Sequence, residues 1–148
     1  MNAKLRPPLF LFGLLFLLLP FGAFLQQTDP WTPEQLMAPA DLAARINAGT
    51  QPLVICVGPS ELIKGSIETG PAKEAANLDK LRALLAREDR NREVVIYCGC
   101  CPFVHCPNVR PAFSLLNSMH FTHARLLDLS HNIKTDWLDH GYPAREAR

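Results

Sequence analysis

An excess of charge of one sign is the feature that this sequence most clearly lacks. The chain has 15 lysines and arginines against 14 aspartates and glutamates, and the basic residues form no stripe. A nucleic-acid-binding function therefore has no support, because such proteins usually carry a clustered positive face. Internal repeats are also absent, and 148 residues leave room for one domain.

The usual cysteine motifs of metal and haem proteins are missing as well. The chain has no two well-separated Cys-x-x-Cys motifs, as structural zinc sites use, no ferredoxin cysteine run and no Cys-x-x-Cys-His haem attachment. Four of the five cysteines instead lie within nine positions, in the sequence YCGCCPFVHCPNVRPA of residues 97–112. Cysteine is thus concentrated in one short segment.

This cysteine-rich segment lies between an apolar run, REVVIYC, and an amphipathic run, PAFSLLNSMHF. We therefore expect a strand that ends at Cys98, a loop that carries the other thiols, and a helix that begins near Pro111. Backbone N–H groups of such a loop, with the helix dipole behind them, can stabilise an anionic sulfur. The sequence predicts the functional site here.

The first residues are typical of a targeting segment. Lys4 and Arg6 form a short basic region, and a nearly continuous apolar run follows over residues 9–25. This run is marginal for spanning a bilayer and suits a signal peptide. We expect residues 1–25 to be a signal peptide or, alternatively, a membrane anchor, with residues 26–148 as the domain. Both alternatives predict export, to the periplasm or the outer side of a membrane, where thiols meet oxidising conditions.

From about residue 30 the chain alternates short apolar runs with amphipathic patterns. Such alternation predicts an α/β layered domain with a mostly parallel sheet, in which ligands bind beyond the carboxyl ends of the strands, where Cys98 falls. Asn77 is expected to cap a helix, and residues 58–76 to form a loop. The patterns predict strands over residues 53–57, 94–97 and 124–129, and helices over residues 41–48, 77–88, 111–119 and 134–140.

The order and content of these segments resemble a rhodanese-like domain. WTPEQL with PADLAARI looks like the opening strand and helix of that family, and REVVIYC is similar to the strand that ends in its catalytic cysteine. WLDHGYP is similar to the family's closing motif. The pattern GCCP…CPN-hydrophobic-RPA resembles a subgroup of exported bacterial members. The resemblance covers nearly the whole domain and implies a single three-layer α/β unit.

The resemblance implies sulfurtransferase activity without a cofactor. The Cys98 thiolate would take a sulfane sulfur from a small donor such as thiosulfate, become a persulfide, and pass the sulfur to a thiol or a cyanide-like acceptor. Arg110 corresponds to the arginine that closes the family's active-site loop, where it would bind an anionic donor or brace the loop. Because Pro111 follows Arg110, we expect Arg110 just outside the helix. The other residues expected to line the site are Gly99, Cys100, Cys101, His105, Cys106 and Asn108.

The chain departs from the family pattern in the site itself. The loop from Cys98 to Arg110 is longer than is usual in the family, Cys56 stands where an aspartate is common, and Ser66 stands in place of a histidine. For an oxidising compartment we favour a bridge between Cys101 and Cys106, which would stiffen the long loop.

Three other hypotheses stay open. One is a metal or iron–sulfur module that uses Cys98, Cys100, Cys101, His105 and Cys106. A second is a thiol–disulfide oxidoreductase that uses Cys98 and Cys101. The third is an inactive rhodanese-like binding domain in which Cys98 is only a buried strand-end residue. A cysteine phosphatase is not expected, because it needs an arginine at the position that Val104 occupies.

Overall fold

A five-stranded parallel sheet forms the centre of the molecule. The computed structural model describes residues 28–59 and 62–146. The strands lie in the order β1-β5-β4-β2-β3, and every neighbouring pair is parallel. The mostly parallel α/β sheet predicted from the sequence is confirmed. The strands are β1 (Leu36–Met37), β2 (Leu53–Cys56), β3 (Ile67–Glu68), β4 (Val94–Tyr97) and β5 (Ala124–Leu127).

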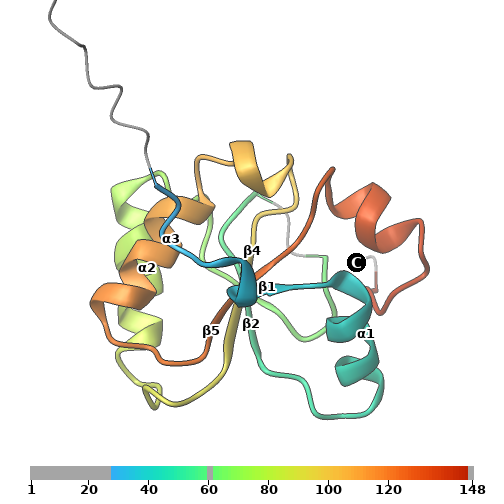
Figure 1. Cartoon of the computed structure of the whole chain (residues 1–148), viewed down its shortest axis with the longest axis horizontal. Coiled ribbons are helices and arrows are strands. Elements are labelled where there is room, and N and C mark those ends of the chain that lie inside the picture. Colours follow the sequence, from blue (N-terminus) through green and yellow to red (C-terminus); the bar gives the residue numbers. More distant parts are fainter. Residues whose placement is uncertain (1–27, 60–61, 147–148) are drawn as a thin grey trace, which may run out of the picture.

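Helices cover both faces of this sheet and make three layers. Helices α2 (Ala75–Leu85) and α3 (Val109–Ser118) lie together on one side, whereas α1 (Pro39–Asn47) and the closing helical turn η3 (Lys134–Leu138) lie on the other (Figure 1). Because both faces are covered, all residues of β2 and β4 are buried. This explains why these strands read as continuous apolar runs in the sequence.

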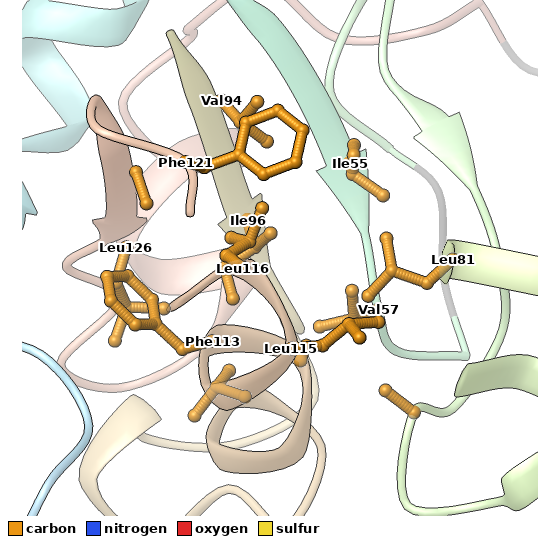
Figure 2. Packing of buried hydrophobic residues seen from close by; sticks show 14 of the residues in the cluster. Ile55, Val57, Leu81, Val94, Ile96, Phe113, Leu115, Leu116, Phe121 and Leu126 are labelled. Carbon is orange, nitrogen blue, oxygen red and sulfur yellow. The ribbon is translucent and has the colours of Figure 1, made fainter. Parts of the chain in front are cut away.

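Strand side chains alternate between two hydrophobic clusters. Ile55 and Ile96 point into the cluster under α2 and α3, and their neighbours Val54 and Val95 point into the cluster under α1 and η3. Figure 2 shows the first cluster, where Phe113 and other apolar residues of α3 lie beside Ile96 of β4. This packing holds α3 next to β4, so both ends of the loop that joins them are fixed in position.

Helices α1, α2 and α3 each begin two residues earlier than the sequence patterns suggest. Helix α2 begins at Ala75 after Glu74, so the prediction that Asn77 caps it is wrong. The Asn77 side chain lies inside the first turn, where Nδ2 donates to the Pro71 carbonyl and the Glu74 carboxylate. Helix α3 begins at Val109, because a proline is tolerated in a first helical turn, where its missing N–H costs nothing. Arg110 therefore lies within the helix, and not outside it as predicted.

The predicted loop over residues 58–76 contains a short strand. Strand β3 pairs with β2 through Ile55 and Ile67 at the edge of the sheet. Both residues of β3 are exposed, so no apolar pattern marks them as a strand. The other predicted elements are present with their ends shifted by a few residues at most.

In the described part of the chain, no helix is both long enough and apolar enough to cross a membrane. The predicted signal peptide or anchor of residues 1–25 lies outside that part.

Candidate functional site

Cys98 lies at the carboxyl edge of the sheet, directly after the central strand β4. The register pairs Tyr97 at the end of β4 with Cys56 at the end of β2. Cys98 is only 3% exposed and belongs to the cluster under α2 and α3. The sequence placed the site at this strand end, and the structure places Cys98 there.

Gly58, which follows β2, lies against Cys98. A Cβ atom at Gly58 would lie 2.3 Å from the Cys98 carbonyl oxygen and 2.7 Å from its Sγ. Both distances are too short for a real contact, so only glycine lets the two strand ends approach this closely. The sequence interpretation missed Gly58. The signal was present, since Gly58 ends a buried run that must lie beside REVVIYC in a parallel sheet.

Gly99 turns the chain sharply away from the sheet after Cys98. Its φ of +84° lies in the left-handed region that favours glycine. The Gly99 carbonyl accepts a hydrogen bond from Ile133 N at 2.9 Å, and a Cβ at Gly99 would lie 3.0 Å from Ile133 Cβ. The turn therefore needs glycine for both conformation and space, and it holds the loop against the segment before η3.

Three cysteine sulfurs converge beyond this turn. The Sγ atoms of Cys98, Cys100 and Cys106 all lie within 4.8 Å of one another, and those of Cys98 and Cys100 are 3.2 Å apart. Cys98 and Cys106 are buried, whereas Cys100 is exposed. The cluster thus reaches from the core to the surface.

Cys101 does not belong to this group of three. Its sulfur lies 3.4 Å from that of Cys100. Cys98, Cys100, Cys101 and Cys106 form no disulfide with one another, so the predicted bridge between Cys101 and Cys106 is absent from the described structure. The reason is the helical turn η2 (Phe103–His105), which directs the buried Cys106 toward Cys98. The oxidoreductase hypothesis, which pairs Cys98 with Cys101, gains no support from these contacts.

Several hydrogen-bond donors are directed at the Cys98 sulfur. Asn108 Nδ2 donates to it at 3.3 Å, and so do the backbone N–H of Cys100 and the thiol of Cys106. Asn108 is 4% exposed, and its Oδ1 accepts from Lys73 N at 3.1 Å. Because the backbone N–H of Lys73 occupies the oxygen, the amide must present its nitrogen to the sulfur. Asn108, expected in the loop from the sequence, is thus a direct partner of Cys98.

These donors place the negative charge of the cluster on Cys98. The hydrogen bond from Cys106, with smaller contributions from Cys100 N–H and Asn108, outweighs burial and lowers the pKa of Cys98 to about 5. The same hydrogen bond raises the pKa of Cys106 far above its ordinary value. Burial and the neighbouring Cys98 sulfur raise the pKa of Cys100 to about 12. One thiolate and two neutral thiols are therefore expected at neutral pH.

Arg110 holds the outer part of the loop. Its guanidinium donates to the Asp29 carboxylate at 2.6 Å and to the Val104 carbonyl at 2.9 Å, and lies 5.3 Å from the centre of the Trp31 ring. These contacts tie the loop to the segment before β1, so Arg110 braces the loop. Binding of an anionic donor by Arg110 stays a prediction. Asp29 and Trp31 were not expected here, because they are far from the loop in sequence.

Ser66 supports the strand end on which Cys98 sits. The Tyr97 hydroxyl lies 3.0 Å from Ser66 Oγ and accepts from the backbone N–H groups of Leu62 and Ile63. Ser66 Oγ in turn donates to the Ile63 carbonyl at 2.8 Å. Ser66 thus ties β4 to the neighbouring loop. His105, the remaining predicted residue, is exposed in η2.

No protein-family model and no curated protein matches the sequence. Among solved structures, the solution structure of a rhodanese-like domain from an Anabaena protein superposes with a TM-score of 0.54, over 76% of this chain and 80% of that one. The fold is rhodanese-like. At 16% identity the likeness concerns the fold alone.

Within this rhodanese-like fold the cysteine cluster occupies the usual place for a ligand in a parallel α/β sheet, beyond the carboxyl ends of the strands. Cys98 follows the central strand, Gly58 follows the adjacent one, and α3 begins on the far side of the loop. The arrangement can hold one anionic sulfur in a buried position with an exposed thiol beside it.

Proposed function

We propose that the domain is a sulfurtransferase that carries a sulfane sulfur as a persulfide on Cys98. The observation that carries the proposal is the set of donors around the Cys98 sulfur: the Asn108 amide, the Cys100 N–H and the Cys106 thiol. A persulfide ends in an anionic sulfur, and such donors stabilise it as they stabilise the thiolate. The rhodanese-like fold is compatible with this chemistry but does not by itself establish it.

The reaction has two displacement steps. In the first, the Cys98 thiolate attacks the outer sulfur of thiosulfate, the sulfur–sulfur bond of the donor breaks, and sulfite leaves with the electron pair. In the second, a thiolate or cyanide attacks the terminal sulfur of the persulfide, and the Cys98 thiolate leaves. Covalent catalysis thus splits one transfer into two, and neither step needs a cofactor.

The burial of Cys98 favours small reactants. Its 3% exposure leaves little room for a direct approach, and the exposed neighbour Cys100 marks the side from which solvent reaches the cluster. We propose a small inorganic donor and a small thiol or cyanide-like acceptor. Arg110 would act by holding the loop closed, and the Arg110→Ala variant distinguishes this role from binding of the donor.

We also propose that this domain works outside the cytoplasm, in the periplasm or attached to a membrane through residues 9–25. The basic region at Lys4 and Arg6 and the apolar run that follows support this location. In an oxidising compartment a sulfur carrier must keep its thiol free.

Intact-mass spectrometry of the purified protein after exposure to thiosulfate tests the sulfur-transfer proposal. One added sulfur atom, removable by cyanide, is expected in the original protein and absent in Cys98→Ser. Cys101→Ser is the matched control, because its sulfur lies outside the group of three, and it should still gain the sulfur. Unchanged labelling of Cys98→Ser would assign the carrier to another thiol and overturn the proposal.

A further inference from the structure

The three sulfurs of Cys98, Cys100 and Cys106 have a spacing close to that of metal-bound thiolates. They come from the end of β4, from the loop and from the turn before α3, and all lie within 4.8 Å of one another. Thiolate ligands about 2.3 Å from a metal ion lie about 3.8–4.0 Å from each other. Small side-chain rotations would therefore be enough to place all three around one ion.

We propose that Cys98, Cys100 and Cys106 form a three-thiolate site for a soft, thiophilic metal ion of the Cu(I) class. Three sulfurs and no carboxylate make up the group, and soft ligands of this kind select soft ions over Mg²⁺ or Ca²⁺. Cys101 and His105, which the sequence also offered as ligands, are not in the group. This proposal does not rest on the proposed sulfur transfer, because the metal site needs three sulfurs where transfer needs one.

The loop is held in place by contacts other than those of the sulfurs. Phe103 N donates to the Leu129 carbonyl at 3.0 Å, Cys106 N donates to the Phe103 carbonyl at 3.1 Å, and Arg110 binds the Val104 carbonyl. The ligands are therefore brought together by the fold before any ion arrives. Such preorganisation reduces the entropy that binding must overcome.

Donors to the sulfurs would reduce their negative charge in the complex. Asn108 Nδ2 and Cys100 N–H donate to Cys98, and the backbone N–H groups of Asn108 and Val109 donate to Cys106. Hydrogen bonds to ligand atoms are typical of metal sites and tune their affinity. The protonated thiols release their protons to solvent as the ion binds. Cys100 is exposed, so the ion enters from its side.

An ion in this site would prevent sulfur transfer, because both uses require the same Cys98 sulfur. Coordination withdraws electron density from the thiolate and lowers its reactivity toward a donor. The proposal therefore predicts competition between a soft ion and thiosulfate at Cys98.

Anaerobic titration of the reduced, purified protein with Cu(I), against a coloured Cu(I) chelator, tests the site. We expect one tightly bound Cu(I) with an ultraviolet thiolate-to-copper absorption band, and no effect of Mg²⁺. Cys100→Ser and Cys106→Ser should each weaken the affinity by at least about tenfold. Cys101→Ser is the control and should bind Cu(I) as the original protein does.

Absence of tight Cu(I) binding, or equal weakening by Cys101→Ser, would overturn the proposal. Binding that survives both Cys100→Ser and Cys106→Ser would also overturn it. Cys106 is buried, so its variant is checked for folding by circular dichroism, and the exposed Cys100 tests the site even if Cys106→Ser does not fold. These readouts do not involve thiosulfate, so their failure would leave the persulfide experiment unaffected.

Discussion

At the scale of single residues, the site distinguishes between thiols that the sequence presents as equivalent. Four cysteines lie close together in the chain: Cys98, Cys100, Cys101 and Cys106. Only the Cys98 sulfur accepts hydrogen bonds from both the Asn108 amide and the Cys106 thiol. A thiolate is the reactive form of cysteine, so reactivity follows from these few hydrogen bonds. Asn108 and Cys106 are therefore positioning residues for Cys98.

The pH dependence of alkylation provides a test of this difference. Because the pKa of Cys98 is lowered to about 5, its thiolate is complete at neutral pH, and the rate of reaction with iodoacetamide should fall only as the pH drops through about 5. Cys106→Ala removes the largest cause of the lowering and should move the midpoint to higher pH. Mass spectrometry of the Cys98 peptide, in metal-free protein, measures the profile.

Cys101→Ser is the control for this profile and should leave its midpoint in place. A midpoint near 8.5 in the original protein, the ordinary value for a cysteine, would contradict the assignment.

Gly58 is the second residue whose role can be tested alone. Gly58→Ala would place a Cβ 2.3 Å from the Cys98 carbonyl oxygen, so one strand end must move. We expect a loss of about 1–3 kcal/mol in the free energy of unfolding, as for other overpacked sites, and a slower alkylation of Cys98. Urea denaturation measures the first effect.

Gly49→Ala serves as the comparison for Gly58→Ala. A Cβ at Gly49 meets nothing within 4 Å, although its φ of +71° costs about 1–2 kcal/mol for a non-glycine residue. Cys98 alkylation should therefore stay unchanged in Gly49→Ala. An unaltered Cys98 reactivity in Gly58→Ala would show that the contact between the two strand ends does not matter for the site.

At the scale of elements, the long loop between β4 and α3 is ordered by contacts to distant segments. Gly99 is hydrogen-bonded to Ile133, just before η3, and Phe103 is hydrogen-bonded to Leu129, just after β5. Arg110 forms an ion pair with Asp29, which precedes β1. The loop therefore depends on at least three other parts of the chain. These contacts hold the long loop in one arrangement.

Arg110→Ala separates bracing of the loop from binding of the donor. The ion pair with Asp29 is partly exposed, so its loss should cost only about 0.5–1 kcal/mol of stability. If Arg110 braces the loop, hydrogen exchange of residues 99–108 should become faster, and thiosulfate labelling of Cys98 should fall modestly. Exchange measured by mass spectrometry, together with labelling rates, gives both readouts.

Asp29→Asn is the matched variant for the bracing role, because it weakens the same ion pair and leaves the guanidinium in place. It should reproduce the faster exchange of Arg110→Ala. A loss of labelling of about a hundredfold in Arg110→Ala, with exchange unchanged, would instead assign donor binding to Arg110.

At the scale of the whole molecule, the question is where the domain works. The proposed export rests on the basic residues Lys4 and Arg6 and on the apolar run over residues 9–25. A reporter that is active only outside the cytoplasm, fused at the carboxyl terminus, should be active when the full chain is expressed in a bacterium. Removal of residues 1–25 should abolish that activity. Reporter activity confined to the cytoplasm would contradict export.

The amino-acid sequence by itself determined the layered α/β architecture and the place of Cys98. Strands β2 and β4 are covered on both faces, so their residues form continuous apolar runs that can be read without a structure. The end of such a run, followed by glycine and a cysteine-rich stretch, marks the carboxyl edge of the sheet. These are local patterns, and local patterns are what a sequence displays directly.

Only the tertiary structure decided which groups meet at Cys98. Three contacts of Cys98 depend on how distant segments fold together. Gly58 packs against Cys98, the Asn108 amide donates to its sulfur, and Cys106, not Cys101, lies in the same sulfur cluster. Arg110 was expected before the helix and lies inside it, because packing of Phe113 and its neighbours extends α3 past the local preference set by Pro111. Contacts between segments far apart in the chain leave no periodic signal, and they determine the chemistry of this site.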